Sequence, residues 1–217
     1  MSAIDDRLDA IMNAPLARLV VPQRQHRLSS SAFSHWRLPE KQRVSLALWG
    51  LPTDFVVRPD YRSTYIEGEP TAPDRSCERR YELGTGIGAA DGLRITATAC
   101  GMVFAIRCGP SRCPAPPIAG IAGTPMMVNS SVFEFVELAW RWRAAAMTLD
   151  PLLLLLRPAG TSGTSRCTDR INTLKSRIFE HALRIDPNII GAHAPGFWHS
   201  LILDFDHHST VPSYITE

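Results

Sequence analysis

Residues 93–147 constrain the fold more than any other stretch of the sequence. Polar and apolar residues alternate over residues 93–98, which is the period of a half-buried β-strand. Cys100-Gly101 then permits a tight turn, and residues 102–106 are almost all apolar, which predicts a second strand covered on both faces. The chain is therefore expected to contain an antiparallel hairpin.

A capped helix is predicted after this hairpin. Ser131 and Glu134 have the spacing of a capping box, in which the serine oxygen accepts a free helix N–H and the glutamate reaches back. Glu137 and Arg141 stand four residues apart, in the order that favours an ion pair. Apolar residues recur at helical spacing, namely Val132, Phe135, Val136, Ala139, Trp142 and Ala146. We expect this helix to pack on the sheet.

The composition is that of a globular protein with a sizeable core. The 217 residues are 45% hydrophobic and 20% charged, enough for one large domain or a domain with extensions. The net charge is only +2 and no dense run of basic residues occurs, so direct nucleic-acid binding is not expected. We predict one domain at residues 37–207, an N-terminal extension of helix and loop at 1–36, and a tail at 208–217.

The N-terminus and the cysteines favour a reduced, cytoplasmic setting. Asp5, Asp6 and Asp9 stand where a signal peptide has basic and then apolar residues. The leucine run at 152–156 is far shorter than the roughly 20 residues that cross a bilayer. The cysteines are odd in number and form no CxxC pair: Cys77, Cys100, Cys108, Cys113 and Cys167. Cytoplasmic localisation without a membrane partner is therefore the expectation.

The remaining segments predict a mixed α and β chain. Before the hairpin we expect a helix that ends ahead of Pro15, a loop at 20–34, a helix from 38–40 to Gly50, a short strand at 55–57, irregular chain at 60–79 and a strand at 81–87. After the capped helix we expect a buried leucine segment bracketed by prolines, a flexible linker at 160–165, a helix ended by Asp186-Pro187 and a last helix from Phe197 to Phe205. Residues 109–125, rich in proline and glycine, predict an exposed loop.

Three groups of residues were weighed as metal or phosphate sites. Gly84, Gly86 and Gly88 depart from a dinucleotide-binding loop because the third glycine is one place early and a strand follows, which favours a plain turn. Cys100, Cys108 and Cys113 lack the paired spacing of zinc ligands. On a helix, Asp204 faces His207 and His208, with Asp206 beside them, but polar residues and histidine also suit the end of a last helix. We assign no metal or cofactor site.

No catalytic residue is assigned either. The sequence has no GxSxG elbow, although a spatial triad would leave no local signature. Trp140 and Trp142 point in different directions on a helix, so one of them is a candidate for an exposed interface anchor, with burial in the core as the alternative. The residue chemistry alone therefore does not say what the protein does.

Four short segments, in order, resemble one known family. They are residues 48–52 with Phe55, the strand residues 83–84, 93–95 and 101–103, residues 128–131 with Phe135, and residues 184–187 with Phe197-Trp198. Together they resemble the SUKH-4 branch of the SUKH superfamily of SMI1/KNR4-like proteins, from about residue 38 to residue 205. Ala97, Thr98 and Ala99 replace an acidic residue often found before the hairpin turn. Residues 109–125 and the first thirty residues have no counterpart.

The resemblance implies both a fold and a function. It implies an α+β fold, a curved and mainly antiparallel sheet with helices packed around it. It also implies an immunity protein that binds and blocks a cognate bacterial polymorphic toxin, often a nuclease or deaminase, across an interface of about 1,200–2,000 Å². No toxin-contact residue carries over. A regulatory or scaffold module, and a metal-binding enzyme using residues 204–208, remain the alternatives.

Overall fold

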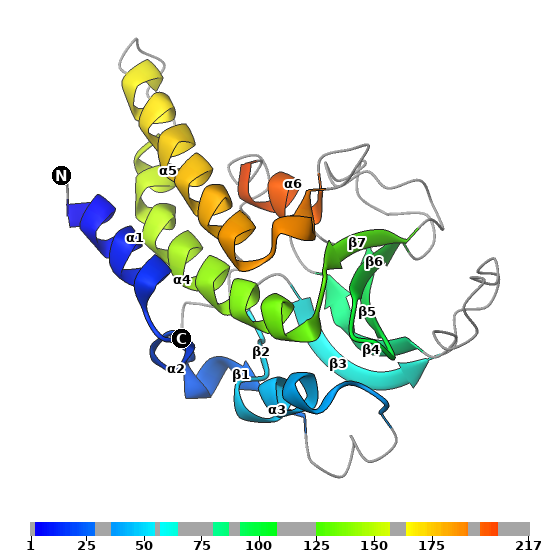
Figure 1. The fold of residues 1–217 in the computed structure, drawn as a ribbon. Coiled ribbons are helices and arrows are strands. Elements are labelled where there is room, and N and C mark those ends of the chain that lie inside the picture. The colour runs from blue at the N-terminus through cyan, green and yellow to red at the C-terminus, as the bar shows by residue number, and fades with distance from the viewer. Residues whose placement is uncertain are drawn as a thin grey trace.

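A five-stranded antiparallel sheet and a layer of helices make up the protein (Figure 1). This computed structural model describes residues 3–28, 36–54, 57–64, 80–86, 92–107, 125–156, 164–190 and 196–203. The strands are β1 (Gln25–His26), β2 (Leu51–Pro52), β3 (Val57–Thr64), β4 (Arg80–Gly86), β5 (Leu93–Thr98), β6 (Val103–Arg107) and β7 (Met126–Asn129). The helices are α1 (Ala3–Asn13), α2 (Leu16–Leu19), α3 (Glu40–Leu48), α4 (Val132–Leu156), α5 (Thr164–Ile185) and α6 (Phe197–Leu203), with short 3₁₀ turns η1 (Pro22–Arg24) and η4 (Pro187–Ile189).

Each strand of the large sheet pairs with its neighbour in sequence, in the order β3-β4-β5-β6-β7. The pairs are all antiparallel, and bulges at β3, β4 and β6 interrupt the register. Bulges increase local twist, and the sheet is visibly curved (Figure 1). The predicted α+β class with a curved, mainly antiparallel sheet is confirmed.

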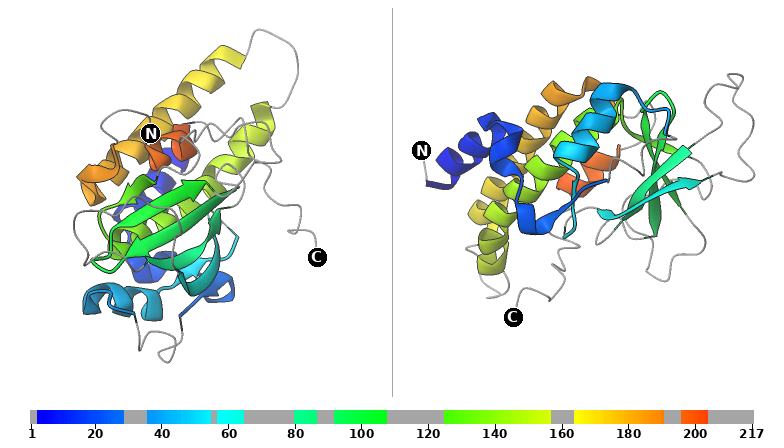
Figure 2. Two further views of the ribbon diagram at one scale, coloured as in Figure 1. Left: turned by 90° about the vertical axis from the view of Figure 1, so that its right-hand side faces the viewer. Right: turned by 90° about the horizontal axis from the view of Figure 1, so that it is seen from below.

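The helices cover one face of this sheet, as Figure 2 shows with the sheet toward the viewer and the helices behind it. Leu83, Ile95 and Val103 of the sheet are fully buried, as are Phe135 and Val136 of α4. They belong to a single hydrophobic core. The predicted helix packed on a sheet is thus observed.

The predicted hairpin and helix cap are both present. β5 and β6 pair from Leu93↔Arg107 to Ala97↔Val103. The turn closes through bonds between Thr98 and the Gly101 and Met102 backbone, and Gly101 has φ 92°. Ser131 Oγ accepts from the N–H groups of Phe133 and Glu134 at 3.2 and 3.3 Å, which confirms the serine half of the capping box.

The C-terminal part of α4 differs from the sequence interpretation. The helix continues through Pro151 to Leu156, so the leucine run is its last turn and not a separate segment. A proline already has helical φ, and it costs the helix one hydrogen bond without ending it here. The burial of those leucines lies outside what the structure describes.

Of the two alternatives for the tryptophans of α4, burial in the core is the one observed. Trp140 and Trp142 are 0% and 2% exposed. Helix α4 contacts α1, α2, α3, α5, β2 and β7, so its opposite sides are both covered. An amphipathic pattern identifies one buried face but does not show that a second layer covers the other.

Three segments predicted as irregular contain regular structure. Residues 20–34 include η1 and β1, and residues 60–64 belong to β3. Strand β1 pairs with β2 over only two residues, too few for a periodic pattern to show. The predicted linker at 160–165 ends inside α5, which begins at Thr164. Residues 55–56, 65–79, 87, 108–124, 157–163 and 204–217 lie outside the described parts of the chain.

The N-terminal helices pack on the same core as the rest of the chain. Leu8, Met12 and Leu19 are buried members of the core, and α1 and α2 both contact α4. The boundaries proposed for the domain and its extensions remain a prediction. The packing does place α1 beside α5, and this arrangement creates the groove described below.

Candidate functional site

Three segments that carry the family resemblance meet in a buried polar network. The Asp186 carboxylate accepts hydrogen bonds from Asn129 Nδ2 at 3.0 Å and from the N–H and Oγ of Ser130 at 2.7 and 2.9 Å. Asn129 Oδ1 accepts from Trp198 Nε1 at 2.8 Å. Asp186, Asn129 and Trp198 are all at most 1% exposed. The network ties the end of β7 to the end of α5 and to α6.

A second buried contact joins α3, the β5–β6 hairpin and α4. Gln42 Oε1 accepts from the Val132 N–H at 3.2 Å, and its Nε2 lies 3.5 Å from the Cys100 carbonyl. A Cβ on Gly101 would lie 1.8 Å from Gln42 Oε1. The hairpin turn therefore approaches Gln42 as closely as only a glycine allows.

The segment at residues 48–52 is held by α4. Trp140 Nε1 donates to the carbonyls of Trp49 and Gly50 at 3.2 and 3.1 Å. Gly50 has φ 52°, and a Cβ there would lie 2.0 Å from the His26 carbonyl oxygen. This tryptophan caps the exit from α3 and fixes the start of β2.

These contacts assign a structural role to the polar residues of the resembling segments. Asp186, Asn129 and Trp198 of these segments use their polar atoms on one another or on backbone groups, as does Trp140 of α4, and all four are buried. A partner protein cannot reach them without unfolding the core. These side chains are therefore not available to form a binding surface.

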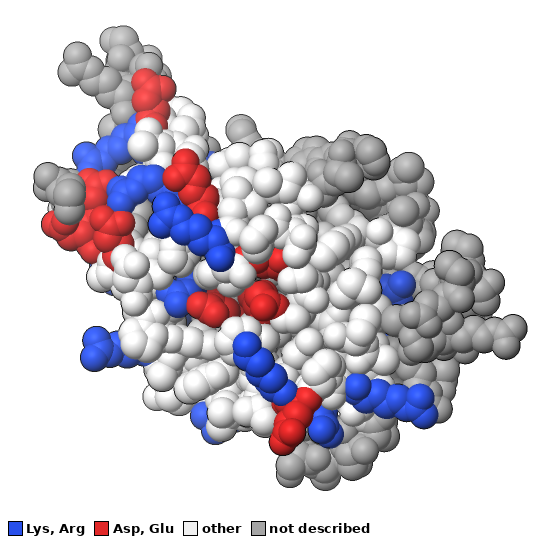
Figure 3. Space-filling model, viewed as in Figure 1, with Lys and Arg blue, Asp and Glu red and all other residues white. Residues whose placement is uncertain are grey.

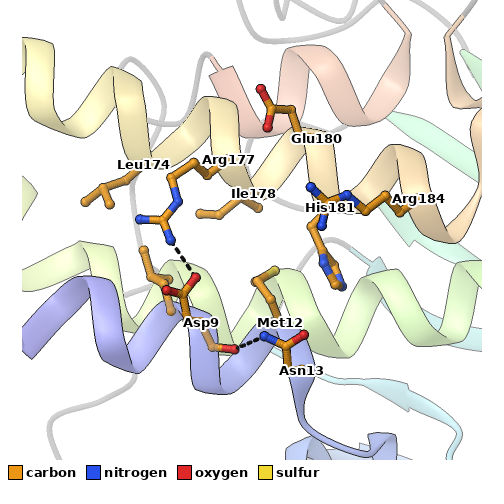
Figure 4. A pocket seen from close by; sticks show the side chains of 10 residues that line it. Asp9, Met12, Asn13, Leu174, Arg177, Ile178, Glu180, His181 and Arg184 are labelled. Atoms are coloured by element: carbon orange, nitrogen blue, oxygen red, sulfur yellow. Dashed lines mark hydrogen bonds and ion pairs between the residues drawn. The ribbon is translucent and has the colours of Figure 1, made fainter. Parts of the chain in front are cut away.

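A groove between α1 and α5 is lined entirely by described residues (Figure 4). Its volume is about 160 Å³. Its floor is apolar and its rim is charged. The lining residues are Leu8, Asp9, Met12, Asn13, Leu174, Arg177, Ile178, Glu180, His181 and Arg184.

One end of the groove is closed by ion pairs between the two helices. Arg177 contacts Asp5 at 3.1 Å and Asp9 at 2.5 Å, and Arg170 contacts Asp5 at 3.1 Å. The Arg177 and Asp9 side chains are 40% and 45% exposed, so solvent screens their attraction and each pair contributes at most about 1 kcal/mol. These charges neutralise one another and hold α1 beside α5.

Arg141 of α4 anchors the C-terminal end of α1 close to the other end of the groove. Its Nη1 donates to the Ile11 and Met12 carbonyls at 2.8 Å, and its Nη2 donates to the Ala14 carbonyl at 3.0 Å. Nε and Nη2 also donate to Glu137 at 3.0 and 2.8 Å, which confirms the predicted pair. A cation at the C-terminus of a helix is stabilised by the helix dipole.

His181 lies between these positive charges. It projects from α5 into the space beside Met12, and Arg184 follows on the same helix (Figure 4). Partial burial lowers the pKa of His181, and the charges of Arg141 and Arg184 lower it further, while Glu137 opposes them. At neutral pH this histidine is therefore mainly uncharged and able to accept a proton when an anion approaches.

Charge on this face of the molecule is mixed. Acidic and basic side chains alternate over α1 and α5, and no large patch of one sign spans the face (Figure 3). A second exposed feature is apolar and lies on α3, where Val44 and Leu48 are 45% and 51% exposed one turn apart. Two side chains form too small a patch to indicate a partner by themselves.

The residues singled out in the sequence do not form a site in the described part of the chain. Gly84 and Gly86 lie within β4 and not in a turn, and Gly88 lies outside the described residues. Cys100 is exposed in the hairpin turn, and Cys108 and Cys113 lie outside the described residues. The cluster Asp204, Asp206, His207 and His208 lies outside them as well. Across the described ranges, no three His, Cys, Asp or Glu side chains are close enough together to hold a metal ion.

Sequence reasoning missed His181 and Arg184 as site residues. They stand on the polar face of a well-predicted amphipathic helix, where charged residues are ordinary. Nothing local marks them, because the groove also needs α1, about 170 residues earlier in the chain.

Comparison with known families now identifies the chain. The model of the SUKH-4 immunity protein family matches residues 11–204. The chain belongs to this family. No curated protein and no solved structure gives a significant match. The SUKH-4 match agrees with the predicted branch and spans the sheet, α2 to α6 and the end of α1.

In the portions that the structure describes, each helix is either too short or too polar to cross a bilayer.

Proposed function

We propose that this SUKH-4 protein binds a cognate bacterial polymorphic toxin in the cytoplasm and neutralises it stoichiometrically, without catalysing a reaction. Membership of an immunity protein family over residues 11–204 is the observation that carries the proposal. Inhibition would be steric, through an interface of about 1,200–2,000 Å² that covers or distorts the toxin's active site.

The internal arrangement of the protein supports binding over catalysis. The polar side chains of the resembling segments hydrogen bond within the core, at Asp186, Asn129 and Trp198. Accessible charged side chains lie at the surfaces of α1 and α5, among them Asp9, Arg177 and Arg184. A rigid core that presents mixed surface charge suits recognition of one partner, because local charge pairing discriminates between partners more than it adds affinity.

Copurification tests the proposal directly. The tagged chain is expressed in its native host, or together with the product of its neighbouring gene, and the proteins that it retains are identified by mass spectrometry. We expect a one-to-one complex with a toxin domain, and survival of cells that express both proteins. Recovery of the chain alone while the neighbouring gene product is present, with no rescue of growth, would contradict immunity.

A catalytically dead toxin variant provides the control for this experiment. It should still bind the chain, because steric inhibition does not need turnover. Unchanged toxin in the complex, by intact mass, would further separate stoichiometric binding from enzymatic modification of the toxin.

A further inference from the structure

The α1–α5 groove has the size of a site for one side chain of a partner protein. Its volume is about 160 Å³. Small-molecule and cofactor sites span about 300–1,000 Å³, so the groove is too small for such a ligand. A single long side chain would fill it.

The floor and the rim of the groove call for different chemistry. Leu8, Met12, Leu174 and Ile178 are buried and provide an apolar floor for a methylene stem. The rim near the end of α1 carries donors, so the tip of the occupant should be polar. An amphipathic side chain fits this combination.

The unpaired charge at that end is positive. Among the described residues, no carboxylate pairs with Arg184, which is exposed, and nothing accepts a hydrogen bond from His181. The five N–H donors of Arg141 are all used on α1 carbonyls and on Glu137. Glu180 lies at the rim but points away from α1 (Figure 4), and Asp9 is held by Arg177 at the other end. The only carboxylate that acts on His181 among the described residues, Glu137, is paired with Arg141, so the end of the groove at Arg184 and His181 lacks an unpaired anion there.

We propose that this groove receives an aspartate or glutamate side chain of the toxin, whose carboxylate pairs with Arg184 and with His181 in its protonated form. The inference rests on the proposed function and names the site through which it acts. The planar guanidinium of Arg184 offers two parallel N–H groups, which match a carboxylate. The groove floor keeps the pair partly away from water, where such a pair is worth more than on an open surface.

Binding of the carboxylate should be linked to proton uptake. Arg141 and Glu137 on α4 and Arg184 on α5 act on the charge of His181, and Asp9 on α1 with Arg177 and Glu180 on α5 are the other charged groups that line the same groove. A new negative charge beside the imidazole raises its pKa above that of the free protein. The complex then binds more protons than the free protein, so affinity increases as the pH falls.

Calorimetric titration of the full-length protein with the catalytically dead toxin domain tests this site. Arg184→Glu should weaken binding by about tenfold or more, since it reverses the charge that meets the carboxylate. Arg58→Glu is the matched control, because Arg58 is an exposed arginine on β3, in the sheet and away from α1 and α5 (Figure 1). It should change the affinity by less than about threefold.

The histidine gives an independent readout. Wild-type protein should bind the toxin domain about threefold or more tightly at pH 6 than at pH 8, and His181→Gln should remove most of that dependence. In the complex, the NMR titration of the His181 imidazole should shift to higher pH. Equal losses for Arg184→Glu and Arg58→Glu, or a pH dependence that His181→Gln leaves intact, would overturn the proposal.

The failure of this site is distinguishable from failure of the proposed function. If wild-type protein does not bind the toxin domain, immunity itself is contradicted. If wild-type binds and Arg184→Glu binds equally well, the toxin contacts another surface. A charge swap, in which one acidic toxin residue becomes arginine and restores binding to Arg184→Glu, would identify the occupant.

Discussion

Asp186 is the residue on which the C-terminal third of the fold depends. Its carboxylate accepts from Asn129, from two groups of Ser130, and from the Asn188 N–H at 3.1 Å, while 1% of its surface is exposed. A buried carboxylate is stable only when several donors compensate for lost hydration. Here one side chain orients the end of β7 and the start of η4 together.

Asp186→Asn should therefore destabilise the protein by about 2–3 kcal/mol. The amide keeps the shape but replaces one acceptor with a donor, which then faces the donors of Asn129 or Ser130. Urea unfolding followed by tryptophan fluorescence measures the loss. Asn188→Ala is the control: its side chain is exposed and only its backbone N–H is used, so a change within about 0.5 kcal/mol is expected. Equal stability of Asp186→Asn and wild type would contradict this role.

Gly101 offers a second test at the scale of one residue. Gly101→Ala places a methyl group against Gln42 Oε1 and imposes a positive φ on alanine, so we expect a loss of about 2 kcal/mol or more. In a Gln42→Ala background the steric part disappears, and the same substitution should cost less. A double-mutant cycle on unfolding free energies checks this coupling, and strict additivity would show that the close approach has no energetic consequence.

A small number of polar contacts join helix α1 to the rest of the fold, and the residues that make each contact are far apart in the sequence. Arg141 reaches three carbonyls at residues 11, 12 and 14, and the ion pairs of Asp5 and Asp9 with α5 are solvent-exposed. The short α1 would be marginal alone, since isolated helices of this length do not persist in water. Its order therefore depends on docking, and Arg141 supplies the buried part of the polar docking energy.

Arg141→Met should release α1 while leaving the sheet folded. The methionine keeps much of the aliphatic bulk but leaves three carbonyls and Glu137 without their donor, at a cost of about 2–4 kcal/mol for the docking of α1. Hydrogen exchange should rise in residues 3–19 and stay low in β4 to β6. Arg18→Met, at an exposed position on α2, is the matched control. Uniform destabilisation of the whole protein would contradict a local role.

Elements marked by apolar periodicity or by a helix cap could be predicted from the sequence. Elements that form only through tertiary contacts could not. Helix α5 was found because Ile171, Leu174 and Ile178 recur on one face, and α4 because Ser131 caps it. Strand β1 was not predicted because tertiary contacts form it. Its two residues pair with β2, and Gln25 Nε2 donates to the Leu48 and Trp49 carbonyls at 2.8 Å. A strand of two residues is too short to show an alternating apolar pattern, and its partner strand lies 25 residues later in the chain.

The groove was unpredictable for the same reason on a larger scale. Its polar rim comes from Asp9 and Asn13 on α1 and from three charged residues on α5, and each of these has an ordinary place on an amphipathic helix. Their function as a set arises only when Arg141 fixes α1 beside α5. The family motifs do not include the groove residues, because the polar residues of those motifs hydrogen bond within the core.

At the scale of the whole molecule, charge is balanced and attraction to a partner must be local. The net charge of +2 gives no strong long-range field. Acidic and basic groups alternate over α1 and α5 (Figure 3), so recognition depends on which pairs a partner completes. The association rate of such an interface should depend only modestly on salt concentration. Its affinity should depend strongly on individual charged residues.

The free protein should lose stability as the pH falls through the range of His181. Burial, Arg141 and Arg184 lower the folded-state pKa of this histidine below its unfolded value of about 6.5. The unfolded chain then binds more protons in this window. The stabilisation is complete above about pH 6.5 and is lost as the pH falls toward the folded pKa. Because the side chain is only partly buried and solvent screens these charges, we expect an effect below about 1 kcal/mol. Unfolding free energies of wild type and His181→Gln between pH 8 and pH 5 should diverge at the acid end, with the variant losing less. Parallel curves would show that the two arginines do not act on His181 in the folded protein.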